Sequence, residues 1–366
     1  MSKSLFITTV QPDVDELLSV LRREQAPKRI HHIELFLDPE IIEAVNRRFG
    51  LSRDLDLSDP FYTLQRDIRV HAFLGYDAFR ISFVHKDIFP MPALESSDTV
   101  AGDQSRGRRE WIVEHEAAIR NWDEFEGYPW PEVNQIDLRP LEWMEKNLPE
   151  GMGCYELTTH IFEMVNFLQG YERLCYNLFD APELVAAICG KVGRFYADFT
   201  ELICDFRCMS VVWGSDDLGF RSATMTSPQF LREQILPWHR KCARIAHEHG
   251  KPYLLHSCGN LDAVMEDLIE NVRIDGKHSF EDTIMPASEA YRRYGQRISI
   301  LGGIDVDFLC RASESEIRRR VRETLDACTG RDHGNGYCLG TGNTVANYIP
   351  LDNYLVMLDE GRRYRL

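Results

Sequence analysis

The chain has 366 residues, of which 44% are hydrophobic and 27% are charged, a composition typical of globular enzymes. Its 42 basic and 58 acidic residues give a formal charge of −16, which disfavours general binding to nucleic acid or to anionic membranes. The ten cysteines are scattered without a CxxC pair, the first residues lack a signal-peptide apolar core, and no run approaches the roughly 18 apolar residues of a membrane span. We therefore expect a cytoplasmic protein with neither nucleic acid nor membrane as a partner.

The N-terminal part of the chain predicts helices around two strands. Residues 1–29 contain one amphipathic helical pattern, which we interpret as an N-terminal helical extension. A strand at 31–36 leads to a helix that begins at Pro39 and is closed by Gly50. Residues 70–83 continue as a short helix, a glycine-containing turn and a second strand.

Residues 85–135 show the least regular pattern and are rich in Asp, Ser, Gly and Arg. They also contain the large aromatic residues Trp111, Trp122, Tyr128 and Trp130. Solvent-exposed tethers seldom contain such residues. We therefore predict a long excursion over one face of the domain and not a linker.

From residue 132 onward, strands and helices alternate. Further strands are expected at 153–158, 209–214, 252–255, 273–280, 298–303 and 336–342. Helices are expected at 132–147, 160–170, 182–206, 228–250, 260–270, 286–294, 314–328 and 351–362. With the two earlier strands this makes eight, each followed by a helix. The alternation predicts an α/β fold in which residues 1–366 form a single (β/α)8 TIM barrel.

The stretch KPYLLHSCGN (251–260) reads as a short strand that ends at His256 and Cys258. Alternate residues of an extended chain point to the same side, so the imidazole and the thiol can face one zinc ion. Two ligands do not make a closed site, and a hydrogen-bonded histidine beside an inert thiol is the alternative. The barrel favours the metal site, because chemistry in such barrels occurs at the carboxyl ends of the strands.

Other polar residues fall at the same ends. They are Glu34, Glu156, Asp216, Asp217, His278, Asp305 and Asn343. Of the two adjacent aspartates, Asp217 is our choice for an acid, a base or a hard ligand, and a helix cap is the alternative for at least one of them. His278 is either a third ligand, an acid–base group or a satisfied histidine of the polar rim. Asn343 either binds substrate or holds its loop.

Several segments together resemble the uroporphyrinogen decarboxylase (URO-D) superfamily. They are GSDDLGF (214–220), the Ser227-Pro228 helix start with LPWHRK (236–241), HEHGKPYLLHSCGN (247–260), DGKHSFED (275–282), LGGIDVDFL (301–309) and CLGTGN (338–343). The resemblance covers most of residues 200–360 and is looser before residue 150. It implies a single (β/α)8 barrel, in agreement with the strand count.

Within that superfamily the chain resembles the corrinoid-linked zinc methyltransferases more than the porphyrin decarboxylase. The stretch RIHHIELFLD (29–38) lacks the Arg-containing segment with which the decarboxylase holds its substrate's carboxylates. His256 and Cys258, followed by Gly259, look like the methyltransferases' zinc signature. The resemblance therefore implies zinc, a corrinoid protein as partner and a homodimer.

The sequence departs from the methyltransferase pattern at one ligand. Seven residues before Pro350, where those enzymes have a third cysteine, this chain has Asn343. Candidates to replace that ligand are His278, Asp217, Glu156 and Cys338, and a weakly held or absent metal is the alternative. Fewer thiolates leave zinc more electrophilic, which suits polarisation of an ether or alcohol oxygen.

Our leading hypothesis is a metal-dependent methyltransferase that demethylates a small methoxy-type donor and passes the methyl group to a corrinoid protein. The expected metal ligands are His256, Cys258 and His278, with Asp217 as the substitute for the last. The expected catalytic residues are Asp217, Glu156 and Asn343. The expected substrate-binding residues are Trp213, Phe220, Asn343 and Tyr348. The alternatives are a metal-free decarboxylase-like lyase and a non-catalytic barrel that binds a tetrapyrrole or corrinoid.

Overall fold

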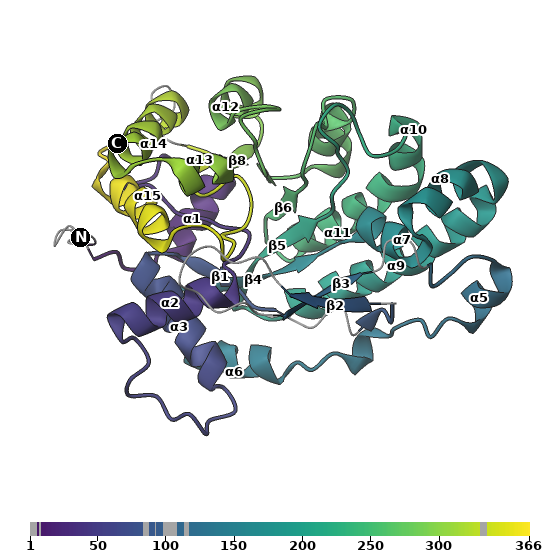
Figure 1. Cartoon of the computed structure of the whole chain (residues 1–366), viewed down its shortest axis with the longest axis horizontal. Helices are drawn as coiled ribbons and strands as arrows, with labels where there is room; N and C mark the ends of the chain where they lie inside the picture. The colour runs from purple at the N-terminus through teal and green to yellow at the C-terminus, as the bar shows by residue number, and fades with distance from the viewer. Residues whose placement is uncertain are drawn as a thin grey trace.

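The centre of the molecule is a curled parallel sheet, seen here in a computed structural model (Figure 1). The structure describes residue 6, residues 9–82, 88–91, 117–329 and 335–366, and the backbone of two strands at 93–97 and 108–112. Seven parallel strands follow one another in the order β1 (Ala78–Arg80), β4 (Gly153–Thr158), β5 (Met209–Ser215), β6 (Tyr253–His256), β7 (Gly276–His278), β8 (Ser299–Leu301) and β9 (Tyr337–Cys338). The fold is α/β and consistent with a TIM-like barrel.

Residues 31–37 contain the segment predicted as the first strand, which would close the barrel between β9 and β1. They lie beside β9. The segment pairs through two isolated parallel bridges, His32 with Leu339 and Leu37 with Val345. Among the described residues it forms no continuous ladder with β1. Side chains span that side instead, because the His31 ring bonds to the Asp77 carboxylate at 2.7 Å. The eighth strand is therefore present only as an extended segment held by short contacts.

Helices cover the outside of the sheet, and α9 and α11 pack against β5 (Figure 1). The α-helices are α1 (Val14–Leu21), α2 (Pro39–Phe49), α3 (Tyr62–Leu74), α5 (Trp122–Gly127), α6 (Arg139–Asn147), α7 (Ile161–Gln169), α8 (Tyr171–Asp180), α9 (Pro182–Cys204), α10 (Pro228–Phe230), α11 (Leu236–Glu248), α12 (Ala287–Tyr294), α13 (Val306–Arg311), α14 (Glu314–Thr329) and α15 (Leu351–Arg363). A 3₁₀ turn, η1 (Val133–Gln135), and two π-helical turns, η2 (Leu231–Ile235) and η3 (Asp267–Val272), complete them.

The N-terminal helix packs on the inside of the barrel. Leu17, Val20 and Leu21 of α1 belong to the same buried cluster as the inward-facing residues of the strands. The hydroxyl of Ser299, the first residue of β8, donates to the Leu21 carbonyl at 2.8 Å. Burial of each of these aliphatic side chains contributes about 2 kcal/mol. Because Ser299 begins its strand, α1 lies at the amino end of the barrel, away from the carboxyl ends.

The structure differs from the predicted elements in several places. Helices α8 and α13 were not expected, and the helix predicted over 228–250 is interrupted by the π-helical turn η2. Within the predicted excursion 85–135, β2 (Ala93–Ser97) and β3 (Arg108–Ile112) form an antiparallel pair, and α5 and η1 follow. Much of that excursion, including Trp111, lies outside the residues whose side chains are described. None of the helices in the described residues is both long and apolar enough to cross a bilayer.

Candidate metal centre

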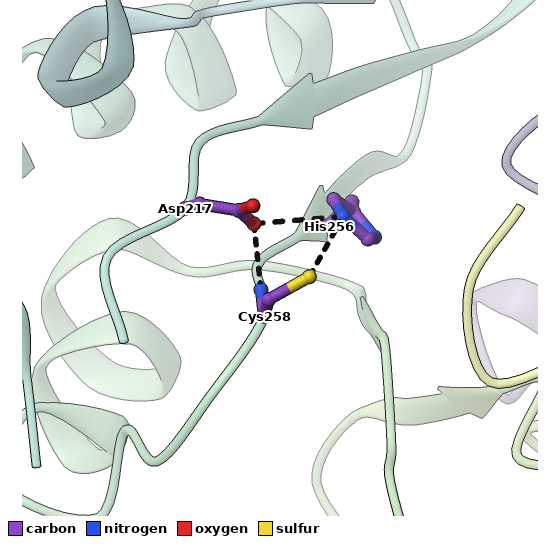
Figure 2. Close-up of side chains that lie close together, drawn as sticks. All are labelled: Asp217, His256 and Cys258. Atoms are coloured by element: carbon purple, nitrogen blue, oxygen red, sulfur yellow. Dashed lines mark hydrogen bonds and ion pairs between the residues drawn. The ribbon is translucent and has the colours of Figure 1, made fainter. Parts of the chain in front are cut away.

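Three donor groups converge at the carboxyl ends of β5 and β6 (Figure 2). Asp217 follows β5, His256 ends β6, and Cys258 lies two residues further on. One ligand atom from each of the three lies within 4.8 Å of the other two. The His256 Nε2 atom is 3.6 Å from both the Cys258 sulfur and Asp217 Oδ1. His256 and Cys258 thus lie together as the sequence predicts, and Asp217, the aspartate preferred from the sequence, is the third donor.

A chain of hydrogen bonds fixes the protonation of His256. The Thr341 carbonyl can only accept, so His278 carries a proton on Nε2, 3.0 Å from that oxygen. Burial lowers the pKa of His278 well below its usual range, so the ring is neutral and its Nδ1 accepts. The His256 Nδ1 atom, 2.8 Å away, is therefore the donor. Burial also lowers the pKa of His256 to about 3, which leaves a lone pair on its Nε2.

His278 itself lies behind His256 and outside the group of three converging donors. Its two ring nitrogens are engaged by His256 and by the Thr341 carbonyl. Its ring also makes an edge contact with Trp213, at 5.9 Å between centroids. His278 was predicted as a third metal ligand. In the structure its position is instead that of a residue that orients the ligand His256.

Cys258 has polar neighbours on more than one side. The Asn343 amide nitrogen is 3.5 Å from the sulfur, and the Ser279 hydroxyl is 3.8 Å from it. Burial, with the negative charge of Asp217 as a second cause, raises the pKa of the Cys258 thiol to about 12. A bound cation is what would make this sulfur a thiolate at neutral pH. The side chain of Asn343 lies where the sequence comparison expected another sulfur ligand.

The two adjacent aspartates have different environments. Asp216 is fully buried and accepts hydrogen bonds from the backbone nitrogens of Phe162 and Glu163 and from the His239 ring, each at 2.9 Å. It therefore caps the first turn of α7 from a neighbouring strand. The Asp217 side chain is 41% exposed, and its Oδ1 accepts the Cys258 N–H at 2.8 Å. Only Asp217 is placed to bind a ligand.

Glu163, in the first turn of α7, was not singled out from the sequence. Burial and the nearby charges of Asp217 and Asp216 raise the pKa of Glu163 well above its usual range, although 24% of its side chain is accessible. One of its oxygens is 3.1 Å from the His160 Nδ1 atom. The raised pKa makes Glu163 a candidate proton donor near Asp217. A glutamate at this helix position carries no motif, so only the contact of the first turn of α7 with Asp216, after β5, reveals it.

A protonated carboxyl group, that of Glu34, holds the loop after β9. The Thr341 hydroxyl lies 2.5 Å from Glu34 Oε2 and 2.6 Å from the Asn343 carbonyl, but it has one proton to donate. If Glu34 is protonated and donates to Thr341, that hydroxyl is free to donate to Asn343. Burial raises the pKa of Glu34 to about 8, in agreement with this arrangement. Glu34 thus fixes the loop that places Asn343 beside the sulfur.

The loops after β5 and β6 touch through two glycines. A Cβ on Gly219 would come within 2.5 Å of the Cys258 carbonyl oxygen, and one on Gly259 would collide with the backbone of Gly219. The Asn260 nitrogen donates to the Phe220 carbonyl at 2.8 Å beside this contact. Only glycine permits such an approach of two backbones. The donors Asp217 and Cys258 are thereby held on loops that are in direct contact.

Lys277 ties the loop after β6 to the loop after β7. Its ammonium nitrogen is 3.2 Å from the Ser257 carbonyl and 2.8 Å from the Ser279 carbonyl. It also lies 4.5 Å from the centre of the Phe280 ring. Burial lowers the pKa of Lys277 to about 8. Lys277 stands in the DGKHSFED segment, but no role was predicted for it from the sequence.

The other four predicted residues do not belong to the group of three converging donors. Glu156 is fully buried in β4, with one oxygen 3.7 Å from the Arg80 guanidinium. Trp213 is fully buried inside the barrel, at 4.9 Å between centroids from Tyr155. Phe220 is 63% exposed and Tyr348 is 45% exposed. The structure therefore brings Asp217 and Asn343 to the cysteine, but not these four.

The donor set fits a zinc ion. One imidazole nitrogen with a fixed lone pair, one sulfur and one carboxylate oxygen are ligands that zinc accepts. Three protein ligands leave a fourth position open to a substrate or water, the pattern of catalytic and not of structural zinc. The hydrogen bond from His256 Nδ1 to His278 is the outer support that metal-bound histidines usually have.

The comparisons with known proteins point to one family. The model of the family described as uroporphyrinogen decarboxylase (URO-D) matches residues 158–364, more than half of the chain. A uroporphyrinogen decarboxylase of Cupriavidus necator is 34% identical over 83 residues, which are 23% of each chain. One of Cupriavidus metallidurans is 33% identical over 79 residues, 22% of this chain and 21% of the relative. The match thus spans about a quarter of the length of these curated relatives.

Two solved structures have a distant likeness. A glycosylated endo-β-1,4-xylanase from Gloeophyllum trabeum has a TM-score of 0.38 at 10% identity, over 66% of this chain and 84% of its own. A uronate isomerase from Bacillus halodurans has a TM-score of 0.33 at 10% identity, over 95% of this chain and 86% of its own. Likeness at this level supports no conclusion about the site.

Proposed function

Because the chain belongs to the uroporphyrinogen decarboxylase family, we propose that it is a metal-dependent member of that superfamily which demethylates a small methoxy-type donor and passes the methyl group to a corrinoid protein. The observation that carries the proposal is the convergence of Asp217, His256 and Cys258 within 4.8 Å at the carboxyl ends of β5 and β6. The corrinoid partner, a homodimer and a cytoplasmic location come from the resemblance to the methyltransferase branch and from the sequence composition.

In the proposed reaction the methyl group leaves an ether or alcohol oxygen. The C–O bond breaks, the oxygen keeps the bonding pair and takes a proton, and the carbon takes an electron pair from the reduced cobalt of the corrinoid. Zinc at this site supplies Lewis-acid polarisation of the donor oxygen.

The residues of the chain have separate roles in this proposal. His256 offers the Nε2 lone pair that His278 fixes, and Cys258 and Asp217 complete the ligand set. Glu163, whose pKa is raised by burial and by the charges of Asp217 and Asp216, supplies the proton for the leaving oxygen. Asn343 orients substrate at the sulfur side of the site.

The first test is metal content. Protein purified without chelator or affinity metal is analysed for zinc beside His256→Ala and Cys258→Ser. We expect near-stoichiometric zinc in the native protein and little in both variants. Absence of metal from the native protein, with no uptake of added zinc, contradicts the ligand assignment.

The second test is methyl transfer. The zinc-loaded protein is mixed with free cob(I)alamin and either methanol or 2-methoxyphenol, and methylcobalamin is followed by its absorbance. We expect methylcobalamin with one donor and none with Cys258→Ser. If zinc binds but neither donor reacts, the metal centre stands and the choice of donor is wrong.

A metal-free decarboxylase-like lyase is the second candidate, because both curated relatives carry the name uroporphyrinogen decarboxylase. It predicts release of CO₂ from a carboxylated substrate that is indifferent to chelators and to His256→Ala. Measurement of ¹³CO₂ release from ¹³C-carboxyl-labelled uroporphyrinogen, with and without chelator, separates the two candidates.

A further inference from the structure

A large cavity lies outside the metal centre, between α2, α3, β1 and the start of α6. Its volume is about 740 Å³, within the usual range for small-molecule sites. Phenyl rings of Phe36, Phe61 and Phe79 line it, and aliphatic side chains and prolines extend this apolar wall. Neither Asp217, His256 nor Cys258 is among the lining residues. Nothing in the proposed methyl transfer uses this cavity.

One charged group on the cavity wall is poorly satisfied. The Arg80 guanidinium lies over the Phe36 ring, 4.8 Å from its centre. Its polar contacts are long, 3.4 Å to the Ser82 hydroxyl and 3.7 Å to the Glu156 carboxylate. Charge-assisted pairs normally lie at 2.7–2.9 Å. The Arg80 Nε atom is buried and has no hydrogen-bond partner among the described residues. Because Nε is sealed from solvent, a ligand would be met by the terminal nitrogens.

The other ionisable groups of the cavity are already engaged. Arg139 is 79% exposed and pairs with Asp137 at 2.5 Å. Asp67 pairs with Arg66 at 2.7 Å. Burial lowers the pKa of His71 to about 4, so its ring is neutral. Arg80 is therefore the cationic residue of this wall that has N–H groups available to donate hydrogen bonds to a ligand.

The guanidinium and the phenyl rings that line the cavity indicate the chemical class of its ligand. A guanidinium presents two parallel N–H groups, which match a carboxylate. A phosphate carries nearly two negative charges, and the single under-bonded arginine would leave one of them unpaired. The phenyl rings favour a flat apolar body over a sugar or a peptide. An aromatic monocarboxylate satisfies both conditions.

We propose that this cavity binds an aromatic carboxylate, with the carboxylate held by Arg80 and the ring packed against Phe36 and Phe61. The binding does not depend on metal or on the proposed function. It also gives Arg80 the short acceptor that its present neighbours do not provide.

The test measures binding of 2-naphthoate and its uncharged amide to the full chain by titration calorimetry, with and without EDTA. We expect the acid to bind at least tenfold more tightly than the amide, equally with and without chelator. We expect Arg80→Gln to lose at least tenfold in affinity for the acid and to bind acid and amide alike. Leu64→Trp, which narrows the apolar part of the cavity and leaves Arg80 in place, should weaken binding of both.

Arg139→Gln is the matched control, because that arginine lies on the same wall but is already paired. It should change the affinity by less than twofold. If Arg80→Gln does not fold, Arg80→Lys keeps the charge without the paired N–H groups and should lose several-fold. The proposal is overturned if acid and amide bind equally to the native protein, if neither binds at millimolar concentration, or if Arg139→Gln and not Arg80→Gln removes the binding.

Discussion

His256 and His278 meet through their Nδ1 atoms, 2.8 Å apart, so one ring must donate and the other accept. The Thr341 carbonyl decides which, since it requires a proton on the far nitrogen of His278. The lone pair that His256 turns toward Cys258 is thus determined by a residue of the loop after β9. The candidate metal centre is in this way connected to three separate strands.

Replacing His278 should weaken metal binding without removing a ligand. His278→Phe deletes the acceptor, so His256 can place its proton on Nε2, and we expect zinc affinity to fall about 10- to 100-fold. His278→Asn offers an amide oxygen in place of Nδ1 and should stay within about threefold of the native protein. Competition with a chromophoric chelator measures the affinities. Long-range ¹H–¹⁵N spectra of histidine-labelled protein report the His256 tautomer. Equal affinities in all three proteins would contradict the role given to His278.

Asn343→Cys should tighten the site. The Asn343 amide is 3.5 Å from the Cys258 sulfur, so a cysteine there would bring a second sulfur to the same point. We expect zinc affinity to rise at least tenfold, and sulfur-to-cobalt charge-transfer absorption to grow in the Co²⁺-substituted protein. Asn343→Ser is the control and should show no increase. Unchanged absorption in the cysteine variant would mean that residue 343 does not face the metal.

The two aspartates should separate stability from ligand binding. Asp216→Ala leaves two backbone N–H groups and the His239 ring without their acceptor in a buried place, which costs about 3–5 kcal/mol. Asp217→Ala removes one hydrogen bond at a partly exposed site and should cost about 1 kcal/mol. Urea unfolding of the metal-free proteins measures both. Zinc affinity should fall only in the folded Asp217→Ala protein, and an equal loss of stability in both variants would refute this division.

Glu34 should make the fold less stable as the pH rises. Its pKa is raised to about 8, so between its ordinary value near 4.5 and about 8 the folded state binds a proton that the unfolded state has lost. The contribution of Glu34 is therefore zero below about pH 4.5 and becomes unfavourable up to about pH 8, by on the order of 5 kcal/mol.

Glu34→Gln imitates the protonated side chain at every pH. The variant should match the native protein near pH 4.5 and exceed it in unfolding free energy at pH 8 and above. Urea titrations at several pH values give the difference between the two proteins, which cancels the other titrating groups. A difference that does not change with pH would show that Glu34 is ionised in the folded state.

Parts of the fold could be predicted because their sequence signals are local. β4 agrees with its predicted range and β5 extends one residue further, since both are short, largely apolar segments bounded by polar turns. The helix predicted over 160–170 corresponds to α7 and ends at Gly170 as expected, but no element was predicted for residues 171–180, which form α8 directly after that glycine. The π-helical turn η2 lies inside an otherwise regular helical pattern and leaves no trace in the hydrophobic spacing.

The candidate site divides in the same way. His256 and Cys258 could be found from their spacing on one strand, and Asp217 from its place after the neighbouring strand. The role of His278 depends on the contact of its Nδ1 atom with the Nδ1 atom of His256. This contact arises from the tertiary structure and leaves no pattern in the sequence. Glu163 and Arg80 also escape sequence reasoning, because the environment of each includes a carboxylate more than fifty positions away, Asp216 for Glu163 and Glu156 for Arg80.

The contact between Gly219 and Gly259 has a consequence for the choice of ion. Asp217 and Cys258 stand on two loops whose backbones already touch, so neither loop can draw nearer to follow a small ion. A cation with a radius that matches the spacing of the donors binds with little rearrangement. A larger cation has to displace Asp217 or Cys258, although both stand on loops that are held in place by their contact with each other. The contact of the two glycines thereby makes the candidate site selective for the radius of the ion, and the fold sets this selectivity before a metal binds.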